Sequence, residues 1–209
     1  MHKAIRRHIS GVAVALWHAA ERAVQKGSIG LNRKPIIASG FGGRDKVTAA
    51  LARYLAENCH LRFASAALVF EIDDFRKIEE IYDCNLIEDI LLETRKRLRH
   101  LLQASDVAAR LEGPRFAIAL TPYRRLDLAG AIQLAASIQR AMAEPIVLAQ
   151  GNLYITASVG FALASRLDKP IGGQLLRAAS VAQLEASRDR PNAILSYSPA
   201  MHKRVQRFA

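Results

Sequence analysis

A strand gives way to a helix within Phe70-Glu71-Ile72-Asp73-Asp74-Phe75-Arg76-Lys77-Ile78, the stretch that decides the fold. The apolar run that ends in this stretch covers residues 64–72 and is short, which predicts a strand. Apolar residues then recur at helical spacing over residues 74–82 and 86–102. The sequence therefore predicts a strand followed by helices, which is how many α+β domains begin.

The rest of the chain continues this alternation of strands and helices. Two short apolar runs, residues 107–111 and 116–120, flank a turn sequence that contains Gly and Pro, which predicts a hairpin. The other expected elements are helices over residues 45–58, 126–142 and 175–187 and strands over residues 146–148, 154–164 and 193–197. This order predicts an α+β fold whose antiparallel-rich sheet carries helices on one face.

An amphipathic helix is expected at the N-terminus, over residues 1–27. One apolar stripe recurs there at three- and four-residue spacing, formed by Ile5, Ile9, Val12 and Leu16. Such a stripe suits pairing with a second helix, either in a homodimer or on a partner protein. Packing of the stripe on the chain's own domain is the alternative interpretation.

Composition shifts divide the chain into a central domain and two basic ends. The Gly-rich residues 28–43 are interpreted as a linker, residues 44–198 as the domain and residues 199–209 as a basic tail. The net charge of +11 comes from the ends, because residues 47–187 hold sixteen basic and sixteen acidic residues. A neutral middle argues against nucleic-acid binding. The basic N-terminus could contact a membrane surface or an acidic partner, or serve solubility alone.

Two cysteines, Cys59 and Cys84, provide neither a disulfide framework nor a paired metal motif. No apolar run approaches the roughly 20 residues that span a bilayer, so no transmembrane segment is expected. A reducing, cytoplasmic setting is the simplest interpretation.

Four phrases of the sequence are similar to conserved phrases of one family, the GGDEF diguanylate cyclases. Residues 70–78 resemble the family's Asp-Ile-Asp-x-Phe-Lys-x-Ile, and residues 105–111 resemble the approach to its signature hairpin. Residues 155–162 are similar to its Val-Thr-x-Ser-x-Gly-x-Ala strand, and residues 39–44 echo its beginning. The order and spacing match over residues 36–198. The resemblance implies a nucleotidyl-cyclase-like fold, with a ferredoxin-like βαββαβ sheet flanked by helices.

The family's chemistry uses two metal ions and joins two GTP molecules, one from each protomer, into cyclic di-GMP. By resemblance, the first metal carboxylate falls on Glu71, whereas the second falls on Pro114 and the catalytic Glu on Arg115. The signature Gly-Gly-Asp/Glu-Glu-Phe reads Glu112, Gly113, Pro114, Arg115 and Phe116. Proline offers no ligand and a guanidinium repels divalent metal. The hairpin is therefore expected to keep its structure and to lack its chemistry.

The implied nucleotide contacts are altered as well. The guanine-binding Asn and Asp of the family fall on Glu79 and Glu88. The alternative interpretation is that both are acids on the solvated surface of a helix. The phosphate-binding Lys and Arg fall on Ser187 and Pro191. Two nearby cations could substitute for them or be solvated helix-end charges, namely Arg188 and Arg190.

The product-inhibition motif of the family, Arg-x-x-Asp before the hairpin, reads Gln103-x-x-Asp106. Asp106 is thus the remnant of that site. No cofactor is expected, and Mg²⁺ and GTP enter only if residual binding survives.

Three functions follow from the resemblance. The first is a catalytically inactive GGDEF domain that regulates, senses GTP or cyclic di-GMP, or binds a partner signalling protein. The second is the front part of a GGDEF–EAL phosphodiesterase, because residues 196–204 resemble the link into an EAL domain. The third, an active cyclase, requires Glu71 to work without its hairpin partner.

Overall fold

The structure is a computed structural model that describes residues 36–38, 43–57, 65–124, 126–149, 151–168 and 170–201. The expected N-terminal helix, with Ile5, Ile9, Val12 and Leu16, lies outside the described residues, as do residues 202–209 of the tail. Within the described ranges, no helix combines the length and the apolar character that a membrane crossing requires.

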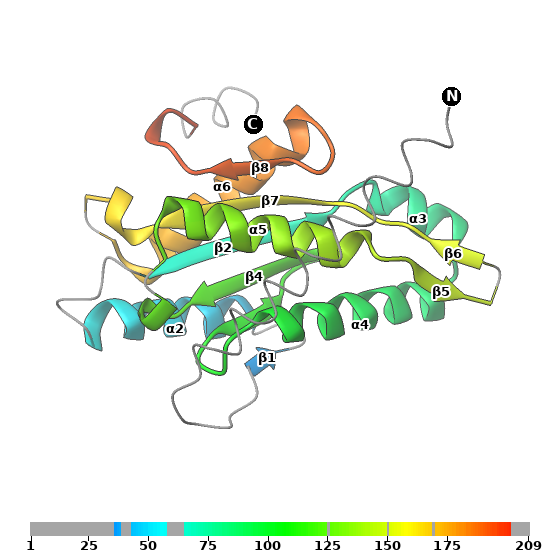
Figure 1. Ribbon diagram of the computed structural model, residues 1–209, viewed down its shortest axis with the longest axis horizontal. Helices are drawn as coiled ribbons and strands as arrows, with labels where there is room; N and C mark the ends of the chain where they lie inside the picture. Colours follow the sequence, from blue (N-terminus) through cyan, green and yellow to red (C-terminus); the bar gives the residue numbers. More distant parts are fainter. Residues whose placement is uncertain are drawn as a thin grey trace. The chain divides into compact units, whose positions relative to one another are not determined.

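A six-stranded sheet forms the centre of the domain, with the strand order β1-β3-β4-β2-β7-β8 (Figure 1). Its strands are β1 (Ile36–Ala38), β2 (Ala66–Ile72), β3 (Val107–Arg110), β4 (Arg115–Leu120), β7 (Ala157–Leu163) and β8 (Ile194–Ser196). The four inner strands are antiparallel, and each edge strand pairs in parallel. A separate small hairpin joins β5 (Ile146–Leu148) to β6 (Gly151–Leu153).

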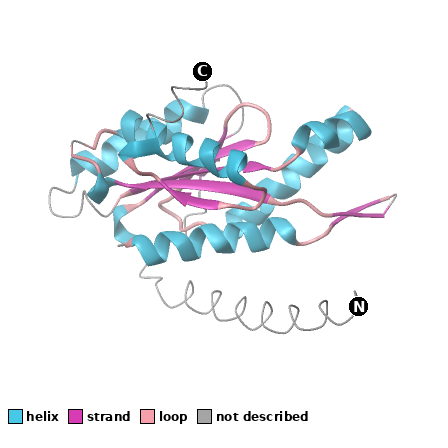
Figure 2. Ribbon diagram, turned by 90° about the horizontal axis from the view of Figure 1, so that it is seen from above, coloured by secondary structure: helices cyan, strands magenta, loops and turns pink. Residues whose placement is uncertain are grey.

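Helices cover both faces of the sheet, as Figure 2 shows. They are α2 (Gly43–Glu57), α3 (Phe75–Ile81), α4 (Cys84–Leu101), α5 (Leu128–Ala143) and α6 (Gly172–Asp189). Helices α4 and α5 pack on one face, and α2 and α6 pack on the other. The inner strands with α4 and α5 make the βαββαβ unit, so the expected ferredoxin-like fold is confirmed. The expectation of helices on one face alone was wrong.

The composition of the central strand β2 explains the second helical layer. Leu68 and Phe70 belong to the core under α4 and α5, whereas Ala67 and Val69 belong to the core under α2 and α6. Phe70 stacks on Phe116 of β4 with ring centroids 5.0 Å apart. A strand that is apolar on both faces is buried on both faces. Small residues on the second face let α2 and α6 approach the sheet closely.

The sheet begins earlier than the interpretation of residues 28–43 as a linker implied. Strand β1 lies within that segment and pairs with β3 in the register Ile36–Val107 to Ala38–Ala109. Helix α2 starts directly against β3, because a Cβ atom on Gly43 would lie 2.6 Å from the carbonyl oxygen of Arg110. A three-residue edge strand among glycines carries too little periodic pattern to predict.

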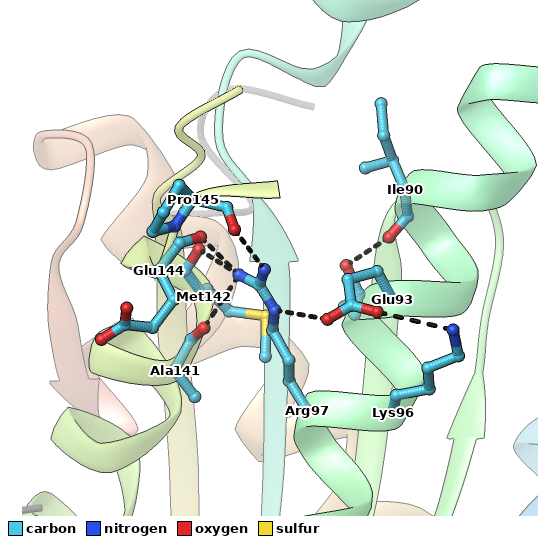
Figure 3. Close-up of polar contacts among 9 residues, drawn as sticks. Ile90, Glu93, Lys96, Arg97, Ala141, Met142, Glu144 and Pro145 are labelled. Atoms are coloured by element: carbon cyan, nitrogen blue, oxygen red, sulfur yellow. Dashed lines mark hydrogen bonds and ion pairs between the residues drawn. The ribbon is translucent and has the colours of Figure 1, made fainter. Parts of the chain in front are cut away.

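The side chain of Arg97 links α4 to the C-terminal end of α5 through hydrogen bonds (Figure 3). Its guanidinium is paired with Glu93 at 3.1 Å and donates hydrogen bonds of 2.5 to 3.2 Å to four carbonyl oxygens. Those oxygens belong to Ala141, Met142, Glu144 and Pro145. The last carbonyl groups of a helix have no partner inside the helix, and Arg97 satisfies two of them, those of the buried residues Ala141 and Met142, together with two in the segment after the helix.

Candidate functional site

A cleft of about 370 Å³ opens where the end of β2, the β3–β4 hairpin, α3 and the end of α6 meet. Five residues that the resemblance singled out line it: Glu71, Glu79, Pro114, Ser187 and Pro191. These positions are spread over more than a hundred residues of sequence, and the fold brings them to one place. The cleft is therefore the candidate site.

Glu71 is held from two sides in this cleft. Strand pairing places it directly opposite Arg115, whose Nε lies 3.8 Å from Oε2 of Glu71. From α6, the Gln183 side-chain amide donates to the same Oε2 at 2.8 Å and to Oγ of Ser187 at 2.6 Å. The side chains of Glu71 and Arg115 are about one third exposed, at 32% and 28%, whereas Gln183 is fully buried. Sequence reasoning missed Gln183, although its place four residues before Ser187 sets both on one helix face.

Asp73 closes the turn between β2 and α3. Its carboxylate accepts hydrogen bonds from the hydroxyls of Thr156 at 2.7 Å and Ser158 at 2.6 Å. It also accepts one from the backbone N–H of Asn192 at 2.8 Å. Asp73, which lines the cleft, thus links it to β7 and to the loop before β8. The sequence did not reveal this role. The phrase containing Ser158 offered a signal, because a hydroxyl facing a neighbouring strand end is a natural partner for a carboxylate.

The signature hairpin is formed as expected between β3 and β4. Gly113 adopts φ = +57°, a left-handed conformation that glycine accepts without steric cost. Arg110 donates from Nε to the Gly113 carbonyl oxygen at 2.9 Å, and the backbone N–H of Leu111 donates to the Arg115 carbonyl oxygen at 2.8 Å. Phe116 is fully buried and Glu112 is exposed.

Outside the hairpin, four other residues singled out by the resemblance are not part of the cleft lining. Glu88 pairs with Arg110 at 3.1 Å. Arg188 and Arg190 are exposed at the end of α6. Asp106 is fully buried.

Asp106 is enclosed by four hydrogen-bond donors. It pairs with Arg124 at 2.5 Å and also accepts from Nε of that residue at 2.8 Å. The backbone N–H groups of Gln103 and Thr121 donate to it at 2.8 and 3.0 Å. The carboxylate therefore organises the turn before β3, and its oxygens are occupied within the protein.

The residues of the cleft do not fit the pair of Mg²⁺ ions that the resemblance implies. Hard cations require several oxygen ligands, usually carboxylates. Glu71 supplies one, Pro114 supplies no side-chain oxygen, and the guanidinium of Arg115 lies beside Glu71. Across the described part of the chain, no three or more His, Cys, Asp or Glu residues come together in a group that could hold a metal ion.

Comparison with known proteins identifies the family that the sequence resembles. A family model described as "Diguanylate cyclase, GGDEF domain" matches residues 38–193. The cyclic di-GMP phosphodiesterase NbdA of Pseudomonas aeruginosa is 30% identical over 128 residues, which are 60% of this chain and 16% of that protein. The chain spans about a third or less of the curated relatives it matches.

Solved structures give the same answer. The isolated GGDEF domain of TpbB (or YfiN) from Pseudomonas aeruginosa superposes with a TM-score of 0.71 at 26% identity, covering 82% of this chain and 95% of that one. An EAL/GGDEF domain protein from M. capsulatus has a TM-score of 0.58 at 27% identity, covering 65% and 85%. Given the family match over most of its length, the fold and the hairpin at the cleft, the chain belongs to the GGDEF domain family.

Proposed function

We propose that this GGDEF domain is catalytically inactive and acts as a regulatory module in cyclic di-GMP signalling. One observation carries the proposal: Pro114 lines the cleft where the resemblance implies a metal ligand, and Arg115, which pairs with Glu71 of the cleft, stands where it implies a catalytic acid. A metal ion coordinates and polarises a reacting oxygen as a Lewis acid, and a guanidinium beside Glu71 has no coordination site with which to do so.

The regulatory part of the proposal rests on what the domain retains. The hairpin is complete, Phe116 is buried, and the cleft keeps a volume of about 370 Å³. A domain that keeps its fold and a cleft can still bind a nucleotide or a protein partner. GTP, cyclic di-GMP and a partner signalling protein are the candidates that the family suggests.

A second candidate is the tuning of a cyclic di-GMP phosphodiesterase domain that follows this one in the same protein. Two similarities favour it: NbdA, which is named a phosphodiesterase, and the EAL/GGDEF protein from M. capsulatus. Residues 196–204 also resemble the link into an EAL domain. The reading frame after Ala209 separates this candidate from the first, because an EAL-encoding sequence there would support it.

Incubation with GTP and Mg²⁺, followed by chromatographic analysis of the nucleotides, tests the loss of catalysis. We expect no cyclic di-GMP above the protein-free background, because the donor set for metal is incomplete. An active diguanylate cyclase in a parallel reaction is the positive control. Clear formation of cyclic di-GMP by this chain would refute the proposal.

Calorimetric titration with GTP, GMP and cyclic di-GMP then separates two forms of regulation. Saturable binding in the micromolar range would identify a ligand-sensing domain. Binding of none of the three nucleotides would refute the ligand-sensing form of the proposal.

A further inference from the structure

Resting on the proposed function, we propose that the guanidinium of Arg115 takes the place of a metal ion as the counter-charge of Glu71. The charge of the Glu71 carboxylate is then balanced by a side chain of the protein, and a divalent cation is not required for this.

Strand register provides the first support. Glu71 and Arg115 are direct cross-strand partners in the antiparallel pair of β2 and β4. Side chains that face each other in this way have Cβ atoms roughly 4.5–5.5 Å apart. The backbone therefore holds the side chains of Glu71 and Arg115 next to each other. The observed separation of 3.8 Å between Nε and Oε2 is within ion-pair distance.

Gln183 of α6 provides the second support. Its buried amide nitrogen donates to both Glu71 and Ser187, so the amide is oriented with its NH₂ group toward the carboxylate. The reverse orientation would place the amide oxygen against a carboxylate oxygen, which is repulsive. Oε2 of Glu71 is therefore engaged by a neutral donor and a cation at the same time.

Three other acids line the cleft, namely Asp73, Asp74 and the exposed Glu79, but among the described residues none of them joins Glu71 in a group that could hold a metal ion. Asp73 accepts three hydrogen bonds from its surroundings, and Asp74 pairs with Lys77 at 2.9 Å. A divalent ion at Glu71 would have to compete with Arg115 and would find one carboxylate in place of several. The arrangement thus disfavours metal both by charge and by ligand number.

Titration with Mn²⁺ in the absence of nucleotide, followed by electron paramagnetic resonance, tests the inference. We expect no saturable binding of Mn²⁺ by the natural chain up to millimolar concentration. The double variant P114D/R115E restores two acids at the hairpin and should bind one Mn²⁺ saturably, with a Kd at least roughly tenfold below the highest concentration at which the natural chain shows no binding. Adding Glu71→Gln to that variant should abolish the gain.

Two further variants keep the result interpretable. Arg177→Glu makes the same change of charge as Arg115→Glu alone, on the exposed face of α6, and should leave Mn²⁺ binding unchanged. If P114D/R115E fails to fold by circular dichroism, Arg115→Gln removes the counter-charge with the turn intact and should also bind Mn²⁺ more tightly than the natural chain. Saturable Mn²⁺ binding by the natural chain, or the absence of any gain in the folded variants, would overturn the inference.

The outcomes distinguish this inference from the proposed function. If the natural chain bound Mn²⁺ but formed no product from GTP, the role of Arg115 as counter-charge would be refuted and the proposed function would stand. Formation of cyclic di-GMP would refute the proposed function, whatever the cation titration gave.

Discussion

At the scale of a single residue, we expect a substitution of Arg97 to lower the free energy of unfolding. It donates to four carbonyl oxygens beyond and within the last turn of α5 while only 12% of its side chain is exposed. We expect Arg97→Lys to lower the free energy of unfolding by about 2 kcal/mol, because an ammonium group cannot reproduce the planar fork of donors. Urea denaturation measures the change.

The control for this prediction is Arg99→Lys, an exposed position on the same helix that should change stability by less than about 0.5 kcal/mol. An Arg97→Lys variant as stable as the natural chain would show that solvent satisfies the α5 carbonyl groups equally well.

The sequence predicted which residues meet at the cleft better than it predicted how they are held. Glu71, Glu79 and Pro114 were expected together and line the same space. Gln183 and Asp73 were not singled out, because their roles depend on contacts across 112 and 85 residues of chain that no local pattern encodes. Uncharged or turn-forming residues give little sign of such long-range partners.

At the scale of elements, Gly160 sets the distance between β7 and α6. A Cβ atom at this position would lie 1.9 Å from the backbone nitrogen of Gln183, so the helix would have to move. We expect Gly160→Ala to destabilise the fold by about 3 kcal/mol, since close-packed interiors do not absorb an added methyl group. Thermal or urea unfolding gives the value.

Gly173→Ala is the matched control, because a Cβ atom there meets nothing nearer than the Thr48 side chain at 3.9 Å. It should be neutral or slightly stabilising. Equal stability of the two variants would mean that α6 can shift on the sheet without cost.

Element order was predictable from the sequence, and layer assignment was not. The run over residues 64–72 gave the central strand, and the Gly-Pro turn gave the hairpin. Both were found as β2 and the β3–β4 connection. The second helical layer was missed because alanine residues such as Ala67 and Ala117 give a weak signal in a hydrophobic pattern. In the fold they are buried, and their small size lets α2 and α6 pack closely on the sheet. Strand β1 was missed because three residues carry no period.

For the whole molecule, the question is whether the chain associates through its N-terminal stripe. If that helix forms a dimer, Ile9→Asp together with Leu16→Asp should give a folded monomer by light scattering, because two buried charges oppose helix pairing. The matched control is Ser10→Asp with His18→Asp, which adds the same charges on the opposite side of the expected helix. A dimer that persists in the first variant would exclude this mode of association.

The cross-strand pairing of Glu71 with Arg115 also bears on how such a domain could evolve. Changing Arg115 back to an acid, by itself, would set two carboxylates face to face on neighbouring strands while Pro114 still offered no ligand, and like charges so placed destabilise a sheet. Natural selection would meet a less stable intermediate before any gain of activity. If the domain is inactive as proposed, the charge reversal at Arg115 would oppose a stepwise return to activity, because the first step lowers the stability of the fold.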